Sequence, residues 1–154
     1  MDLVVCDAAR TAQLLDFTLL MEAVAQAATE VEAGTLRSPP RLVVPLGQGG
    51  VLLSMPATAP DIAIHKLVNV QRANAQRGLP TIHGVVTVCD AATGQPLCLL
   101  DGPEVTGRRT AAVSLLAIRS LLGRAPEEVL LLGTGAQSRY HMQALQAVFP
   151  QARV

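Results

Sequence analysis

A short apolar segment that runs directly into a glycine turn and then a helix constrains this chain most. Residues Val129–Leu132 are all apolar, Gly133-x-Gly135 follows, and a helical pattern extends from about Ala136 to Val148. A wholly apolar strand is typical of a parallel sheet buried on both faces. Strand, Gly-x-Gly and helix in this order open a Rossmann unit, whose turn lets backbone N–H groups approach a pyrophosphate. A purely structural turn is the alternative.

The glycine pattern is only a partial dinucleotide fingerprint. In the full G-x-G-x-x-G pattern the third glycine allows close packing of helix against strand, and Ser138 occupies that place here. A small side chain still permits such packing. The residue that separates NAD from NADP is expected about 20 positions further on, beyond Val154. The pattern therefore predicts a dinucleotide and leaves NAD or NADP open.

The preceding residues mix helix and strand patterns. Asp16 is suited to cap a helix whose apolar face runs from Phe17 to Val31. Thr106 is expected to cap a second helix that reaches about Leu122. Apolar or alternating runs predict strands at Leu42–Pro45, Val51–Met55, Asp61–Val70, Ile82–Val88 and Pro96–Leu100, with turns at Gly47–Gly50 and Asp90–Gly94.

These two styles of structure predict an α/β fold in two parts. Residues 1–125 are expected to form an α+β domain. Residues 126–154 are expected to be the first β-α unit of a Rossmann domain that is incomplete. A single β-α unit has no neighbouring strand to pair with, so the sequence predicts that the chain is truncated.

Composition and charge exclude several classes of protein. The formal net charge is zero, which argues against a nucleic-acid partner. No stretch approaches the ~18 apolar residues that a membrane helix needs, and the N-terminus lacks the features of a signal peptide. Cys6, Cys89 and Cys98 lack metal-ligand spacing, so reduced thiols and no metal site are expected. These features favour a cytoplasmic location.

Several segments together resemble the ornithine cyclodeaminase/mu-crystallin family. They occur in the order and spacing of that family and cover nearly the whole chain: Pro39-Pro40-Arg41, Lys66–Asn69, Gly78–Thr81, Val86–Gly102, Thr106–Ala112 and Gly133–Gln137. Arg109-Thr-Ala-Ala112, followed about 24 residues later by Gly133-x-Gly135-x-Gln137, makes the resemblance specific.

Within the family, the segment around His83 is most similar to the cyclic ketimine reductases. The resemblance implies an NAD(P)H-dependent oxidoreductase of proline metabolism that reduces Δ1-pyrroline-2-carboxylate or Δ1-piperideine-2-carboxylate to proline or pipecolate. It also implies a homodimer. Ornithine cyclodeaminase activity, with ornithine as the amino acid substrate, and a non-enzymatic small-ligand-binding dimer are the alternatives. The 154-residue chain alone is expected to be inactive.

The resemblance assigns substrate contacts to Arg41 and Lys66. A guanidinium can bind a carboxylate through two parallel hydrogen bonds, and the two prolines before Arg41 would stiffen its backbone. Lys66 is the only lysine among the 12 basic residues, and it interrupts an apolar strand. Burial there would lower its pKa and suit it to proton exchange, so Lys66 is the candidate catalytic residue. A surface arginine and an edge-strand lysine are the structural alternatives.

The resemblance assigns cofactor contacts to a second set of residues: Thr81, Arg109, Gly133, Gly135, Ala136 and Gln137. Arg108 is expected to be a solvated neighbour of Arg109. His65 and His83 have no carboxylate partner visible in the sequence, and His141 is expected to face outward and to be inert. The acidic catalytic residue of the family falls outside these 154 residues.

Overall fold

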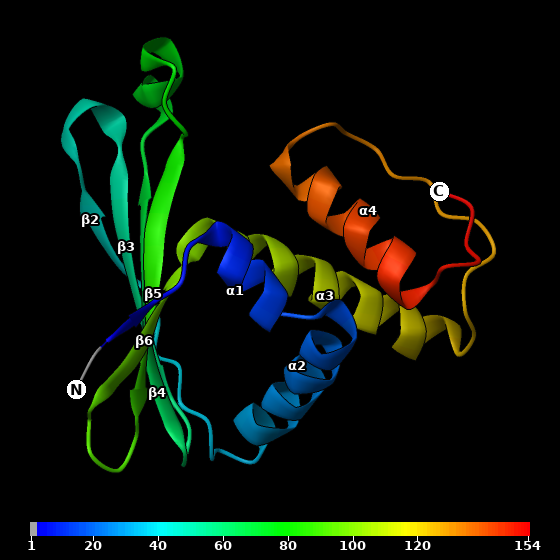
Figure 1. The fold of residues 1–154 in the computed structure, drawn as a ribbon, viewed down its shortest axis with the longest axis horizontal. Coiled ribbons are helices and arrows are strands. Elements are labelled where there is room, and N and C mark those ends of the chain that lie inside the picture. The colour runs from blue at the N-terminus through cyan, green and yellow to red at the C-terminus, as the bar shows by residue number, and fades with distance from the viewer. Residues whose placement is uncertain (1–2) are drawn as a thin grey trace. The chain divides into compact units, whose positions relative to one another are not determined.

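The computed structural model describes residues 3–154, which form two compact units (Figure 1). The first unit holds the residues up to Thr11 and Glu30–Pro103, and the second holds Ala12–Thr29 and Glu104–Val154. The predicted domain boundary at residues 125 and 126 stays a prediction. No helix among residues 3–154 combines the length and apolar character needed to cross a membrane.

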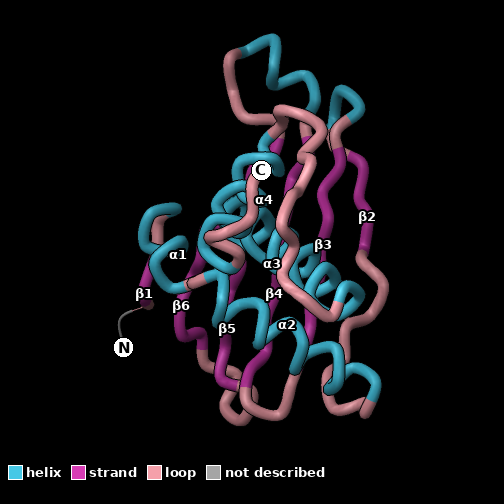
Figure 2. Tube along the Cα trace, turned by 90° about the vertical axis from the view of Figure 1, so that its right-hand side faces the viewer, coloured by secondary structure: helices cyan, strands magenta, loops and turns pink. Residues whose placement is uncertain are grey.

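The first unit is built on a six-stranded sheet with the order β1-β6-β5-β4-β3-β2 (Figure 2). Strands β2 to β6 pair antiparallel, while β1 runs parallel to β6. The strand bounds are Val4–Val5, Leu42–Pro45, Val51–Thr58, Ile62–Val70, Ile82–Asp90 and Pro96–Asp101 for β1 to β6 in turn. The predicted strands at the positions of β2 to β6 are confirmed, and β1 is too short to leave a sequence pattern.

Two turns of the sheet follow directly from their residues. Gly94 adopts a φ of 71°, the left-handed conformation that the β5–β6 turn requires. Asp90 Oδ1 accepts hydrogen bonds from the Thr93 hydroxyl (2.6 Å) and the Thr93 amide (2.7 Å). The hydroxyl bond is the main cause that holds the pKa of Asp90 below its usual value. The predicted turn at Asp90–Gly94 is therefore confirmed.

The second unit is helical, and three helices share its core. Helix α2 (Phe17–Glu32) begins after Asp16, whose Oδ1 accepts hydrogen bonds from the amides of Thr18 (2.9 Å) and Leu19 (3.1 Å). It packs with α3 (Gly102–Leu122) and α4 (Ala136–Val148). The buried core residues of these helices and of the segment after α4 are Phe17, Met21, Ala111, Ala112, Leu115, Tyr140, Ala144, Leu145 and Phe149. A further short helix, α1, spans Ala8–Leu14 and was missed by the sequence analysis.

Helix α3 begins earlier than the sequence analysis expected. Its first residue is Gly102, directly after β6, so Thr106 lies inside the helix and is not its cap. Pro103 suits a first helical turn because its φ is already helical and its missing N–H would have no partner there. Glu104 adds an acidic side chain to the same turn, where the helix dipole favours negative charge.

The predicted strand at Val129–Leu132 does not form. Only one parallel bridge joins this region to another segment, between Glu128 and Arg153. The Val129 amide donates to the Arg153 carbonyl (2.8 Å) and the Arg153 amide donates to the Glu127 carbonyl (2.9 Å). Within residues 3–154 no strand lies alongside the rest of the segment, and Leu130 and Leu132 are 82% and 83% exposed. A strand needs a partner for its backbone hydrogen bonds, which explains the failure of the prediction.

Gly107 allows α4 to approach α3 closely. A Cβ atom at this position would lie 2.1 Å from Cε2 of the Tyr140 ring. We therefore expect Gly107→Ala to destabilise the protein by on the order of 1–3 kcal/mol, the usual range for overpacking a core. Thermal unfolding followed by circular dichroism measures the change.

Gly47→Ala is the matched control because a Cβ at Gly47 meets nothing within 4 Å. Its melting temperature should stay close to that of the wild type. Equal melting temperatures for the two variants would show that the space between α3 and α4 can accept a methyl group at position 107.

Candidate functional site

Lys66 lies in the middle of β4, where its neighbours across the sheet are apolar. Its register partners are Met55 on β3 and Val86 on β5, and side chains opposite each other in a sheet point to the same face. Val86 is 3% exposed, and Val68, two residues along β4 on the same face, is 6% exposed. Lys66 itself is partly exposed. The structure therefore places the one lysine of the chain within an apolar sheet face.

Arg41 lies next to the first residue of β2 and is exposed. Leu42 pairs with Ser54, so Arg41 stands at the level of Met55, which is itself paired with Lys66. Strand alternation puts Arg41 and Lys66 on the same face of the sheet. Their backbones are two strand spacings apart, about 10 Å. Two cationic side chains of this length can converge on one small carboxylate between them.

Thr81 lies at a different place in the first unit. It immediately precedes β5, where its carbonyl accepts a hydrogen bond from the Gln71 amide (2.8 Å). Five residues separate it from Val86, the register partner of Lys66, which corresponds to about 16 Å along an extended strand. The register therefore puts Arg41 and Lys66 on one face of the sheet, on either side of Met55, and leaves Thr81 near one end of the sheet.

The glycine turn before α4 is held by a positive-φ glycine and by the first turn of the helix. Gly133 has a φ of 108°, a conformation that side-chain-bearing residues rarely adopt. Ser138 stabilises the turn by donating its hydroxyl to the Gly133 carbonyl (2.8 Å) and its amide to the Gly135 carbonyl (3.0 Å). The serine in the third fingerprint position therefore ties the turn to the helix that follows it.

The residues around this turn fit a dinucleotide phosphate. Ala136 and Gln137 are exposed in the first turn of α4, where backbone N–H groups have no carbonyl partner within the helix. A cavity of about 440 Å³ is lined by Val129, Leu130, Leu131, Gly133, Thr134, Ser138, Arg139, Met142 and Val154. Arg109 is exposed on α3. A smaller apolar cavity of about 120 Å³, between Leu36 and Ile64 in the first unit, contains none of the predicted site residues.

His65 and His141 have different hydrogen-bond partners. His65 Nε2 shares a hydrogen bond with the Ser54 hydroxyl (2.8 Å). The expectation that His141 faces outward is wrong. It is partly buried, its Nε2 shares a hydrogen bond with Ser114 Oγ on α3 (2.9 Å), and its Nδ1 lies 2.8 Å from the Gln137 carbonyl. His141 therefore joins α4 to α3.

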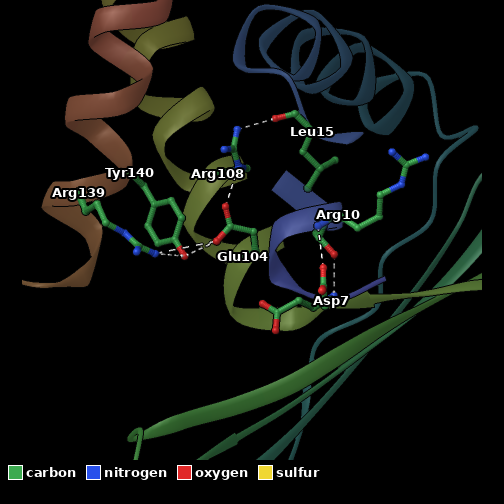
Figure 3. A network of polar contacts seen from close by, with 9 residues as sticks. Asp7, Arg10, Leu15, Glu104, Arg108, Arg139 and Tyr140 are labelled. Atoms are coloured by element: carbon green, nitrogen blue, oxygen red, sulfur yellow. Dashed lines mark hydrogen bonds and ion pairs between the residues drawn. The ribbon is translucent and has the colours of Figure 1, made fainter. Parts of the chain in front are cut away.

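A buried carboxylate cluster in the second unit was missed by the sequence analysis (Figure 3). Glu104 is 8% exposed, and its Oε1 accepts a hydrogen bond from Arg108 Nε at 2.7 Å. Arg108 also donates to the Leu15 carbonyl (2.9 Å), and its guanidinium lies 4.5 Å from the centre of the Phe17 ring. The prediction that Arg108 is solvated is therefore wrong, since its side chain is 14% exposed. The four-residue spacing of Glu104 and Arg108 was the available sequence signal.

Tyr140 completes this cluster from α4. Its hydroxyl donates to Glu104 Oε2 (2.8 Å) and accepts a hydrogen bond from Arg139 Nη2 (3.0 Å). Burial, reinforced by the hydrogen bond to Glu104, raises the pKa of Tyr140 above its usual value of 10.0. The protonated hydroxyl is thus the form that the folded protein favours.

No group of three or more His, Cys, Asp or Glu side chains in residues 3–154 is arranged to hold a metal ion. Cys6, Cys89 and Cys98 are free thiols, and burial raises the pKa of the Cys98 thiol above its usual value. A raised pKa lowers the thiolate fraction and therefore the reactivity of this cysteine. The candidate residues therefore form two separate groups, Arg41 and Lys66 in the first unit and the glycine turn in the second.

Comparison with known proteins identifies the family of the chain. The pattern of the ornithine cyclodeaminase/mu-crystallin family matches residues 1–154. The chain belongs to this family. It is 56% identical over 150 residues to the Delta(1)-pyrroline-2-carboxylate/Delta(1)-piperideine-2-carboxylate reductase of Azospirillum brasilense, covering 97% of this chain and 48% of the relative. It is 55% identical over 148 residues to Delta(1)-pyrroline-2-carboxylate reductase 2 of Burkholderia ambifaria, with 96% and 48% covered.

Solved structures share the fold. An archaeal alanine dehydrogenase dimer with bound NAD superimposes with a TM-score of 0.85 at 27% identity, covering 97% of this chain and 47% of that one. The Thermococcus litoralis Delta(1)-pyrroline-2-carboxylate reductase, solved with NADH and L-proline, gives 0.81 at 25% identity, with 93% and 45% covered. The chain thus spans about half the length of the curated relatives and solved structures that it matches.

The pKa of Tyr140 can be measured directly because the chain contains one tyrosine and no tryptophan. We expect the tyrosinate absorbance of the folded 154-residue chain to appear at a pH above 10.0, the usual midpoint. An unfolded chain loses this proton near its ordinary pKa, so the contribution of Tyr140 to stability is complete below that pH. It is lost as the pH rises through the folded pKa.

Glu104→Gln should move the midpoint back toward the usual value, since the charged acceptor is removed. Chemical denaturation at each pH should show that Tyr140→Phe reduces the alkaline loss of stability. A folded-state midpoint at or below 10.0 would contradict the buried hydrogen bond.

Proposed function

We propose that the protein carrying this chain reduces cyclic imino acids with NAD(P)H, converting Δ1-pyrroline-2-carboxylate or Δ1-piperideine-2-carboxylate to proline or pipecolate. The 56% sequence identity to a reductase named for both substrates supports this function most strongly. The common sheet face of Arg41 and Lys66 supports it independently, because a cyclic imino acid presents one carboxylate and one nitrogen.

Each residue has a distinct task in this proposal. Arg41 binds the ring carboxylate with its guanidinium, which fixes the orientation of the substrate. Lys66, on the same sheet face as Arg41, would donate a proton from its ammonium group to the imine nitrogen and would then, as a neutral amine, accept a hydrogen bond from the iminium N–H. A protonated imine carries positive charge, which makes its carbon a better hydride acceptor. The nicotinamide, when bound, supplies that hydride.

The cofactor residues are proposed from the geometry of the second unit and of the sheet end. The Gly133-x-Gly135 turn with Ala136 and Gln137 would bind the phosphates, and Arg109 would add a charged contact. Thr81 would contact the cofactor from the first unit. Solved relatives contain NAD in one case and NADH in another, which supports a nicotinamide cofactor here.

A homodimer and a cytoplasmic location are also proposed. The alanine dehydrogenase relative is described as a dimer. The exposed apolar side chains of the edge strand β2, Leu42, Val43 and Val44, are consistent with a covered surface in an assembly. Free thiols are consistent with a reducing compartment. Static light scattering of the purified protein determines the number of chains.

The reaction is tested with the complete gene product. It should oxidise NADH or NADPH with Δ1-pyrroline-2-carboxylate, and it should release little ammonia from ornithine and NAD. A cyclic imine that lacks the carboxylate should be a much poorer substrate, since a hydrogen bond to a charged group contributes about 1.5–3 kcal/mol. Sustained ammonia release from ornithine would instead favour the cyclodeaminase, and binding of the imine without turnover would favour the non-enzymatic binder.

The role of Lys66 is tested by Lys66→Met, which keeps a side chain of similar length and removes the amine. We expect kcat/KM for the imine to fall by about 100-fold or more, the usual scale of an acid–base contribution. The affinity for NAD(P)H should change little, because Lys66 is assigned to the substrate. Arg72→Met, which removes an exposed cation from the β4–β5 connection, is the control and should retain activity. Near-normal turnover by Lys66→Met would remove Lys66 from the mechanism.

A further inference from the structure

The cluster around Glu104 connects the interior of the second unit to the wall of the cavity beside the glycine turn. Tyr140 lies in the second turn of α4, a few residues after Gly135. Its hydroxyl bonds to the buried Glu104 carboxylate on one side and to Arg139 on the other (Figure 3). Arg139 lines the 440 Å³ cavity together with Gly133 and other residues of the turn. A continuous set of polar contacts therefore runs from α3 to the cavity wall.

We propose that Glu104 and Tyr140 are positioning residues for dinucleotide binding: they fix the first turns of α4 on α3 and so hold the Gly133-x-Gly135 turn in its binding conformation. This inference rests on the proposed function, because the dinucleotide is the ligand that the turn would bind. Neither residue is proposed to touch the cofactor.

The anchor on α3 is rigid, so it can hold α4 firmly. Glu104 is fixed by the Arg108 guanidinium, and Arg108 is fixed in turn by the Leu15 carbonyl and the Phe17 ring. A carboxylate that is 8% exposed is costly to leave without partners, so Glu104 favours the geometry in which Tyr140 reaches it. Gly107 removes the side chain that would otherwise hold the ring away.

The effect on the turn follows from helix geometry. A helix is stiff over a few residues, so a rotation or shift at Tyr140 moves the N-terminal amides of α4 by a similar amount. Ser138 transmits such a movement to the turn, because its hydroxyl and amide bond to the carbonyls of Gly133 and Gly135. Phosphate binding by backbone amides depends on their direction, so a small reorientation weakens several hydrogen bonds at once.

Arg139 is held by the same contacts. Its guanidinium lies 4.8 Å from the centre of the Tyr140 ring and donates to the Tyr140 hydroxyl, while its side chain is 65% exposed. The Glu104 carboxylate is 4.0 Å from the same guanidinium. Loss of the tyrosine hydroxyl would therefore remove one of these three contacts of Arg139 as well as loosen α4, while the ring and the Glu104 carboxylate remain beside the guanidinium.

Tyr140→Phe is the sharpest test, because it removes the hydroxyl and leaves the ring against Gly107. Ser114→Ala is the matched control: it removes the hydroxyl of a second contact between α3 and α4, the 2.9 Å bond to His141, which does not involve Glu104. Both variants lose one hydrogen bond between the same two helices. If Tyr140 only stabilised the fold, Tyr140→Phe and Ser114→Ala would change the affinity for the cofactor by similar amounts.

The complete gene product is titrated with NADH by fluorescence, and kcat is measured at saturating NADH and imine. We expect Tyr140→Phe to raise the Kd for NADH by about 5- to 10-fold, less than the full effect of a lost hydrogen bond to a charged group, because Tyr140 acts on the cofactor only through the position of α4. Its kcat at saturation should stay within about twofold of wild type. Ser114→Ala should leave the Kd within about twofold, even where its loss of thermal stability is similar.

Amide hydrogen exchange of the 154-residue chain gives a readout that does not require the cofactor. Tyr140→Phe should accelerate exchange of the amides of residues 138–142 by about the same factor as the change in Kd, and Ser114→Ala should do so less. An unchanged Kd in Tyr140→Phe, or equal rises of Kd in both variants, would overturn the positioning role alone. If the wild-type protein binds no NADH, the proposed function and this inference both fail.

Discussion

The buried carboxylate of Glu104 imposes the strongest single constraint on the helical unit. A carboxylate removed from water requires hydrogen-bonding partners, and here these come from two helices. Arg108 is one helical turn further along α3, and Tyr140 reaches across from α4. Arg108 in turn contacts the chain before and within α2 through Leu15 and Phe17. Glu104 and Arg108 together therefore join three helices.

The same unit contains a segment that has no comparable constraint. Val129–Leu132 is apolar throughout, and an unbroken apolar strand suits a position with a neighbour on each side. In residues 3–154 only the bridge between Glu128 and Arg153 approaches that arrangement. Each fully exposed leucine forgoes about 1.5–3 kcal/mol of burial energy. The glycine turn is thus held by Ser138 on the side of α4, while the apolar segment before it makes few backbone hydrogen bonds.

The sequence predicted elements whose signal is local and missed those that depend on distant partners. Apolar or alternating runs identified strands β2 to β6, and Asp16 correctly marked the start of α2 because a cap acts on the next few amides. The strand at Val129–Leu132 failed because strand formation requires a second segment. His141 was misjudged for a related reason, since its partner Ser114 lies 27 residues away and leaves no spacing pattern. Arg108 had a local signal in its four-residue spacing from Glu104, but its second partner, Leu15, lies 93 residues away.

For the candidate substrate residues, too, the sequence indicated which residues to consider but not how the strands that carry them pair. Arg41 and Lys66 were chosen by resemblance, yet their common face follows only from the pairing of β2, β3 and β4. In the proposed function, that face would present both side chains to one small substrate. Reduction of a cyclic imine and cyclodeamination of ornithine both involve a substrate with a carboxylate and a nitrogen. Arg41 and Lys66 would serve that shared requirement in either reaction, so they would not by themselves select the direction of hydride transfer. The selection would depend on the cofactor that is bound and on the groups that complete the pocket around it.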